Sequence, residues 1–222
     1  QKVLIPMDLS QTDHLKAYGL AFGVLKQGYD VEWLLNYRGG SFLVDATETL
    51  LKESRLRNIR LESLTNVDVG RVYAEIEETN ADRIKLEKPP RIAVYTPPNK
   101  QPWDDAVTLA LAYAEIPYDT LWDAEVLTGK LSEYDWVHLH HEDFTGQYGK
   151  FYRSHGRELW YRQQQRAFEH MAHSLGFAKV STQKGAITQA LANYVRDGGF
   201  LFAMCSATDT FDIALAAWGL DI

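Results

Sequence analysis

The residue best suited to chemistry is Cys205, the only cysteine in the chain. The apolar residues 200–203 predict a strand that leads into it, and residues 210–218 predict a helix that follows. Small residues, Ala203 and Ala207, stand two positions before and after the cysteine. This pattern is typical of a nucleophile elbow, a tight strand-to-helix turn that presents a side chain to a cleft. The helix N-terminus would favour the thiolate, and the alternative is an inert cysteine in the core.

A second group of candidates lies in residues 136–143, which contain three histidines followed by two acids. On a strand over 134–141, His138 and His140 would face one side and His141 the other. His140 or His141, beside Glu142, could act as a general base. His138, His140 and Glu142 could instead hold zinc, or the histidines could be hydrogen-bonded residues of the core. Because three histidines of one strand cannot all face one ion, we expect no metal. We expect no other cofactor either.

The elements around these candidates follow from the hydrophobic pattern. Short apolar segments alternate with amphipathic stretches, which is typical of an α/β fold with a mostly parallel, doubly wound sheet in a three-layer sandwich. Lys88-Pro89-Pro90 predicts an internal boundary, because proline does not continue a helix or a central strand. We therefore expect an α/β segment over 1–88 that packs on or extends the sheet of a domain over 91–222. Ligands of such sheets bind beyond the carboxyl ends of the strands, where both groups of candidates fall.

Composition narrows the range of partners. The 222 residues carry a formal net charge of −7, with 45% hydrophobic and 24% charged residues. These are ordinary globular values, and the acidic balance argues against nucleic acid as the main partner. No apolar run is long enough to cross a bilayer, and nothing in the sequence indicates an oligomeric state. If Gln1 follows a cleaved signal peptide, the protein is exported or periplasmic, and otherwise it is cytoplasmic.

Three longer segments carry a resemblance to a known family. They are Asn36-Tyr37-Arg38-Gly39-Gly40-Ser41-Phe42, His140-His141-Glu142-Asp143-Phe144-Thr145-Gly146-Gln147-Tyr148-Gly149-Lys150-Phe151 and Phe202-Ala203-Met204-Cys205-Ser206-Ala207-Thr208-Asp209. On these segments the chain is similar to bacterial proteins named asparagine synthetase B-like or glutamine amidotransferase-like. Residues 91–217 resemble the class I glutamine amidotransferase fold, which is a flavodoxin-like α/β sandwich.

The resemblance implies that a cysteine nucleophile hydrolyses a small amide or amino-acid-like substrate. It puts Cys205 at the nucleophile position, with the N–H groups of Ser206 and Gly146 as the oxyanion hole. No histidine follows Cys205, so the base would be the His140-His141 pair or a residue of a longer chain beyond Ile222, in which case the domain is truncated at its C-terminal end. The alternative is a non-catalytic domain that binds a small molecule or a carbohydrate in the same cleft.

Overall fold

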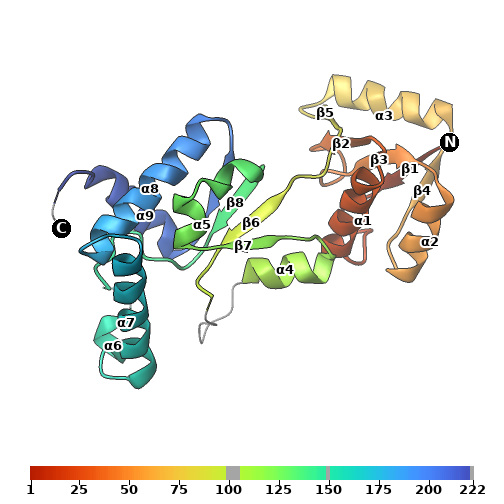
Figure 1. The fold of residues 1–222 in the computed structure, drawn as a ribbon. Coiled ribbons are helices and arrows are strands. Elements are labelled where there is room, and N and C mark those ends of the chain that lie inside the picture. Colours follow the sequence, from red (N-terminus) through yellow and green to blue (C-terminus); the bar gives the residue numbers. More distant parts are fainter. Residues whose placement is uncertain (99–105, 149–150, 221–222) are drawn as a thin grey trace. The chain divides into compact units, whose positions relative to one another are not determined.

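The computed structural model describes residues 1–98, 106–148 and 151–220 (Figure 1). The described chain forms two compact units, of which the first comprises Gln1–Pro89 and Ala106–Pro117. The second unit holds the remaining described residues. The chain therefore enters the second unit at Pro90, within the expected boundary, and returns to the first unit once. Across these described residues, no helix combines the length and the apolar character needed to cross a membrane.

The first unit contains a five-stranded sheet with the order β4-β1-β3-β2-β5. Every neighbouring pair in this sheet is antiparallel. The strands are β1 (Lys2–Ile5), β2 (Val31–Leu35), β3 (Phe42–Asp45), β4 (Glu62–Leu64) and β5 (Asp82–Leu86). Residues 1–88 thus form a sheet of their own. Of the two arrangements expected for this segment, extension of the mostly parallel sheet is wrong.

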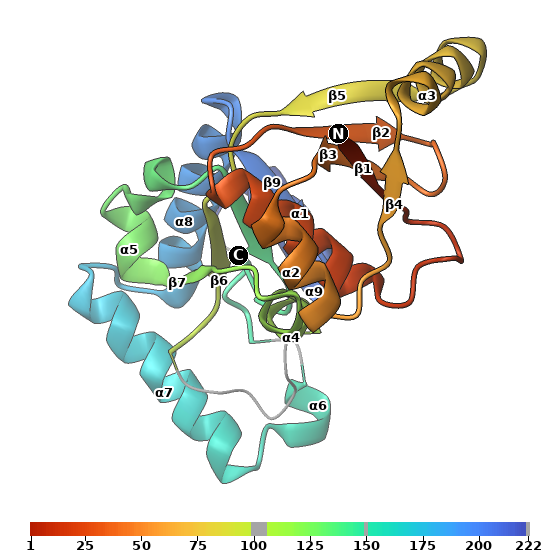
Figure 2. The same ribbon diagram turned by 90° about the vertical axis from the view of Figure 1, so that its right-hand side faces the viewer.

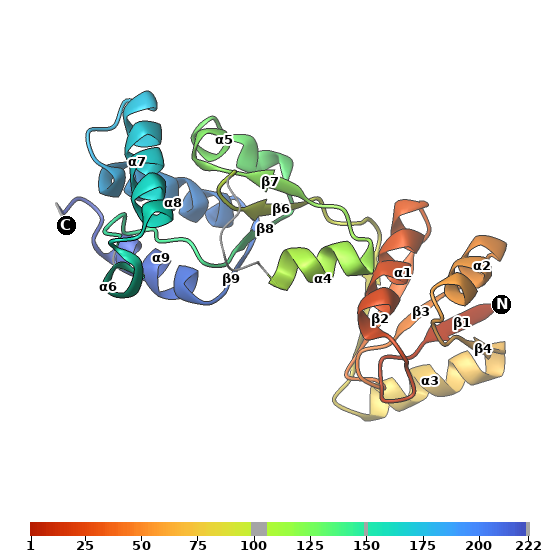
Figure 3. The same ribbon diagram turned by 90° about the horizontal axis from the view of Figure 1, so that it is seen from below.

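Helices cover both faces of this antiparallel sheet. Helices α1 (His14–Lys26) and α2 (Glu48–Leu56) lie on one face, and α3 (Asn66–Glu78) lies on the other (Figures 1 and 3). Alternate residues of β1 divide between the faces, because Val3 and Ile5 join the core beneath α1 while Leu4 packs with α3. Burial on both faces makes β1 apolar from Val3 to Ile5, which is also the pattern of a parallel strand. This double cover is the physical reason for the wrong prediction.

The second unit contains a four-stranded parallel sheet with the order β7-β6-β8-β9. Its strands are β6 (Ile92–Tyr95), β7 (Asp119–Leu121), β8 (Trp136–Leu139) and β9 (Phe200–Ala203). Parallel neighbours need crossover connections, and these usually contain helices. The helices of this unit are α5 (Asp123–Leu127), a 3₁₀ turn (Lys130–Glu133), α6 (Tyr152–His155), α7 (Leu159–Ser174), α8 (Val180–Arg196) and α9 (Ser206–Ala216). The α/β class and the parallel sheet expected for this region are confirmed.

The core of the second unit lies between its sheet and the helices α5 and α8. These two helices lie beside each other on the same side of β6 (Figures 1 and 2). One face of the sheet carries Tyr95 from β6 and the alternate residues Val137 and Leu139 from β8. These side chains pack with Ile187 and Leu191 of α8, and none of the five is accessible to solvent. This packing fixes the end of β8, where the loop that carries His140 and His141 begins.

One helix that lies between two strands of the second unit in the chain belongs to the first unit. Helix α4 (Ala106–Ala114) lies between β6 and β7 in the chain but packs against α1 in the first unit. The approach is close because α1 carries a glycine there: a Cβ atom on Gly19 would lie 1.8 Å from the carbonyl oxygen of Ala114. Tyr113 also donates a hydrogen bond of 2.5 Å to Asp13, the residue that caps α1. The domain expected over 91–222 is therefore interrupted by residues 106–117.

Candidate active site

Cys205 lies in a tight turn between β9 and α9, as the sequence predicts. Strand β9 ends at Ala203, and Cys205 is the N-cap residue of α9 with φ 53° and ψ −137°. This combination is unfavourable for a residue with a side chain, and it persists only where the surrounding structure imposes it. The Cys205 side chain is exposed. The turn therefore presents the sulfur to solvent and does not bury it in the core.

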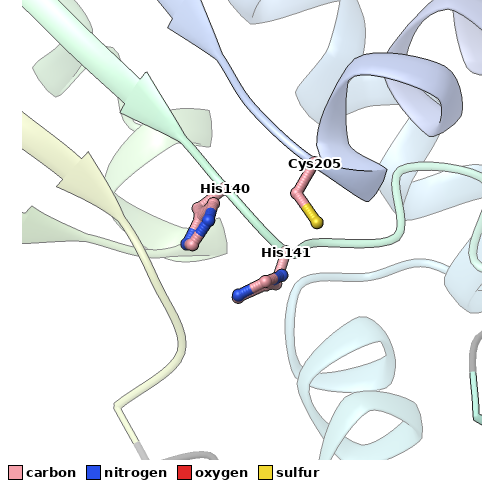
Figure 4. A group of neighbouring side chains, drawn as sticks. All are labelled: His140, His141 and Cys205. Carbon is pink, nitrogen blue, oxygen red and sulfur yellow. The ribbon is translucent and has the colours of Figure 1, made fainter. Parts of the chain in front are cut away.

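Two histidines lie beside the Cys205 side chain (Figure 4). Cys205 Sγ, a ring nitrogen of His140 and a ring nitrogen of His141 all lie within 4.8 Å of one another. The centres of the two imidazole rings are 3.7 Å apart. Strand alternation predicted that His141 would face away from His140. That prediction is wrong, because β8 ends at Leu139 and the alternation does not apply beyond it.

The loop after β8 is hydrogen-bonded to the elbow along its length. The bonds run from main-chain or side-chain donors of residues 204–210 to main-chain oxygens of residues 139–142. They are Met204 N to Leu139 O (2.9 Å), Ala207 N to His140 O (3.1 Å), Ser206 Oγ to His141 O (3.0 Å) and Thr210 Oγ1 to Glu142 O (2.9 Å). Four bonds of ordinary length fix one segment against the other. These bonds to the backbone of residues 139–142 therefore hold the two histidines and the cysteine together.

Glu142 supports this loop through its side chain. Its carboxylate accepts a hydrogen bond of 2.9 Å from the main-chain N–H of His140, which closes a local turn. This contact gives Glu142 a role in the position of the His140 backbone. Ser206 donates its hydroxyl hydrogen to the His141 carbonyl. The role expected for its main-chain N–H, as a donor to an oxyanion, stays a prediction.

Gly146 packs against the first turn of α8. Its φ is +66°, and a Cβ atom there would lie 2.7 Å from both the N and the Cα of Ser181, so the position requires glycine. Gly146, His141 and Glu142 line one cavity of about 80 Å³. Cys205 is not among the described residues that line it. The expected pairing of Gly146 with Ser206 in one oxyanion hole therefore stays a prediction.

The donor atoms of His140, His141 and Cys205 are of the kinds that zinc binds. Tetrahedral zinc holds its ligands about 2.0–2.3 Å from the ion and hence roughly 3.3–3.8 Å from one another. Atoms that lie within 4.8 Å of one another can reach that geometry with small side-chain movements. The zinc ligands considered from the sequence are a different set, His138, His140 and Glu142. Of these, His138 is fully buried, and its ring centre lies 5.8 Å from that of His140. In the described part of the chain, the structure gathers His141 and Cys205 around His140 instead.

A buried ion pair near the site was not predicted from the sequence. Lys184 Nζ lies 2.7 Å from Asp123 Oδ1 and 2.8 Å from the Tyr95 hydroxyl oxygen. Gln183 Nε2 donates to the other Asp123 oxygen at 2.8 Å. Burial, followed by the Asp123 charge, raises the pKa of Tyr95 well above its ordinary value. One signal was present: Lys184 stands three positions before Ile187, on the apolar stripe of α8, where a charge needs a partner.

Comparison with known proteins adds no identification, because no family model, no curated protein and no solved structure matches the chain. The candidate active site is thus defined by its own geometry. It consists of Cys205 at a strained elbow, the two adjacent histidines, and the loop that binds to the start of α9.

Proposed function

We propose that this protein is a hydrolase that cleaves an amide with Cys205 as nucleophile, in the manner of the glutamine amidotransferases. The observation that carries the proposal is the backbone of Cys205, which has φ 53° between a parallel strand and a helix, with His140 and His141 close to the sulfur. Such strain is kept where the position of a side chain matters. A thiol beside a base is the arrangement that nucleophilic catalysis uses.

His141 is the better base of the two histidines. It is partly exposed and lines the cavity, so it can contact both the thiol and a leaving group. His140 is only 8% exposed, and its ring contacts that of His141 at 3.7 Å between centres and 36° between planes. That environment suits a residue that holds the His141 ring in position.

In the proposed reaction, His141 takes the thiol proton and the Cys205 sulfur attacks the carbonyl carbon of the amide. The carbonyl oxygen becomes negatively charged, and the N–H of Ser206, the residue after the nucleophile, would donate a hydrogen bond to it. When the C–N bond breaks, His141 gives the proton to the leaving ammonia or amine, and a thioester remains on Cys205. Water, activated by His141, then hydrolyses the thioester, which releases a carboxylic acid and restores the thiol.

The class I glutamine amidotransferase-like fold and its three-layer sandwich are part of this proposal. The four-stranded parallel sheet supports them, as does the position of the site beyond the carboxyl ends of β8 and β9. The antiparallel sheet of the first unit lies outside the residues that carry the fold resemblance, which is confined to 91–217.

The test is the release of ammonia from a panel of primary amides, including L-glutamine, by the full chain. Cys205→Ala removes the nucleophile and should abolish the release. His141→Asn should lower kcat/KM by about 10²–10⁴-fold, the usual effect of losing a general base, and His140→Asn should lower it less. His170→Asn changes an exposed histidine on α7 and is the matched control, with no effect expected.

Undiminished ammonia release by the Cys205→Ala variant would overturn the proposal. Saturable binding of a ligand at the site with no release from any amide would favour the alternative, a non-catalytic domain that binds its ligand in the same cleft.

A further inference from the structure

The cavity beside His141 is the place where the rest of a substrate would lie. It measures about 80 Å³ and lies within the second unit, lined by residues of the loop after β8 and of helices α7 and α8. His141 and Glu142 form part of its lining. A group bound in the cavity is therefore adjacent to the proposed base, and the other lining residues select what that group can be.

Five aromatic side chains contribute to the cavity wall. They are Trp122, Tyr148, Phe151, Tyr161 and Phe168. The ring of Phe168 stacks with that of Tyr148, at 6.3 Å between centres and 12° between planes. The centre of the Trp122 ring lies 5.9 Å from that of Phe168, at 33° between planes. Flat apolar faces of this kind pack best against another planar ring, by offset or edge contacts.

A buried cation completes the inner part of the lining. Lys184 is 2% exposed, and its Nζ lies 4.1 Å from the centre of the Trp122 ring. Asp123, at 2.7 Å, balances its charge. An ammonium group here attracts the face of an aromatic ring and donates hydrogen bonds to a neutral acceptor.

The hydroxyl of Tyr148 offers a second polar group to a ligand. Its oxygen is buried and has no hydrogen-bond partner among the residues that the structure describes. Burial also raises the pKa of Tyr148, so this hydroxyl stays protonated and can donate. A buried hydroxyl without a partner is rare in proteins and gains a hydrogen bond when a polar ligand atom reaches it.

Charge on the lining disfavours anions. Glu142 and Asp143 both contribute to it, whereas the positive charge of Lys184 is matched by Asp123. Gln164 adds an uncharged amide. A carboxylate in the cavity would lie near two like charges without a cation of its own, which costs free energy.

From these contacts we propose that the cavity binds a neutral aromatic ring in the acyl part of the substrate, a proposal that rests on the hydrolase function above. The ring would pack against the aromatic wall that Trp122 and Phe168 form, and the amide carbonyl would lie toward His141. A hydroxyl on the ring would meet the buried donors of Lys184 and Tyr148. The substrate class is then an arylalkanoyl amide and not L-glutamine, whose carboxylate would face acidic side chains.

Binding is measured separately from turnover, by calorimetric titration of the Cys205→Ala variant of the full chain. 3-Phenylpropanamide should bind, and 3-(4-hydroxyphenyl)propanamide should bind about 3–10-fold more tightly, the effect of one additional hydrogen bond. Butanamide lacks the ring and 3-phenylpropanoate is anionic. Each should bind at least about tenfold more weakly than 3-phenylpropanamide, because one loses the aromatic contact area and the other meets like charges.

Two substitutions on α7 locate the ligand. Gln164→Trp puts a ring into the cavity from its wall, whereas Gln163→Trp puts the same ring on the exposed neighbouring position. Gln164→Trp should weaken the binding of 3-phenylpropanamide by about tenfold or more, because two rings cannot fill one close-packed space. Gln163→Trp should leave the dissociation constant unchanged. Circular dichroism shows whether each variant is folded.

The outcomes separate the two proposals. Saturable binding of 3-phenylpropanamide that Gln164→Trp removes supports the aromatic cavity. If the unmodified chain nevertheless releases no ammonia from this amide or any other, the aromatic cavity stands and the hydrolase function fails. Three results would overturn the aromatic cavity, even where the protein hydrolyses butanamide. They are no binding of 3-phenylpropanamide, binding of 3-phenylpropanoate with the same affinity, and tighter binding of methyl glucoside, which stands for a carbohydrate ligand.

Discussion

The hydroxyl of Ser206 donates a hydrogen bond of 3.0 Å to the main-chain oxygen of His141. Ser206 is the first residue of α9 and follows Cys205 directly, whereas His141 belongs to the loop after β8. This bond therefore joins the helix that carries the proposed nucleophile to the loop that carries the proposed base. The separation of sulfur and imidazole depends in part on it.

Ser206→Ala should lower amide turnover while the protein stays folded. The variant keeps the main-chain N–H proposed for the oxyanion and loses only the hydroxyl, so the expected fall in kcat is about 2–10-fold, the usual effect of one hydrogen bond. Steady-state kinetics measure it, and Ser206→Thr, which restores a hydroxyl, should recover most of the rate. Equal rates for Ser206→Ala and the unmodified chain would show that the bond does not position His141.

Lys184→Met should destabilise the second unit strongly. The substitution leaves the Asp123 carboxylate buried without its ion-pair partner, and breaking such a pair costs about 3–5 kcal/mol. The free energy of unfolding is obtained from urea titrations followed by circular dichroism. The double variant Lys184→Met/Asp123→Asn removes both charges and should be more stable than Lys184→Met alone. A double variant whose loss equals the sum of the two single losses would mean that the two side chains do not interact.

Tyr95 should make the protein sensitive to alkali. Burial raises the pKa of Tyr95 above its ordinary value near 10. Because the folded state holds this proton more tightly than the unfolded chain, the stabilisation is complete below about pH 10 and is lost as the pH rises toward the folded-state pKa. Tyr95→Phe keeps the stacking on Trp122 and removes the titrating group. The free energy of unfolding of Tyr95→Phe should therefore fall less steeply between pH 9 and 11 than that of the unmodified chain, and an identical slope would contradict the assignment.

Gly146→Ala should cost more stability than a left-handed backbone alone explains. Its φ is +66°, and the new Cβ would meet the Ser181 backbone at 2.7 Å. The matched control is Gly176→Ala, where φ is +86° and no heavy atom lies within 4 Å of the added Cβ. Gly176→Ala should lose roughly 1–2 kcal/mol, the cost of the conformation, and Gly146→Ala should lose more. Equal losses in urea unfolding would show that the loop at Gly146 moves freely away from α8.

The elbow at Cys205 could be predicted because its signals are local. The strand, the small neighbours and the following helix all lie within residues 200–218. The parallel sheet of the second unit could be predicted for a similar reason, since strands that alternate with helices pair in parallel. In both cases the information lies in the order of the elements along the chain.

The first unit shows where this reasoning fails. Strand β1 pairs antiparallel with β3, with Ile5 opposite Phe42, and nothing at Ile5 itself specifies that partner. The packing of α4 on α1 also depends on a contact between distant residues, Gly19 and Ala114. Pairings of this kind are set by tertiary packing and overrule the local pattern.

The site itself was predicted in part. Cys205 and His140 come together as expected, but the position of His141 depends on β8 ending at Leu139, and element ends are the least certain feature of a sequence pattern. The partner of Lys184 lies 61 residues away in the chain. The apolar stripe of α8 shows that Lys184 needs a partner, but it cannot show that the partner is Asp123.

The most direct test of the central claim is the rate at which iodoacetamide alkylates Cys205 in the full chain at pH 7. The chain has one cysteine, so each adduct found by mass spectrometry reports this residue. Because Cys205 is exposed, access does not limit the rate. An activated nucleophile predicts alkylation about tenfold or more faster than that of glutathione, with a fall toward the glutathione rate in His141→Asn. A rate equal to that of glutathione, and unchanged in His141→Asn, would contradict the claim.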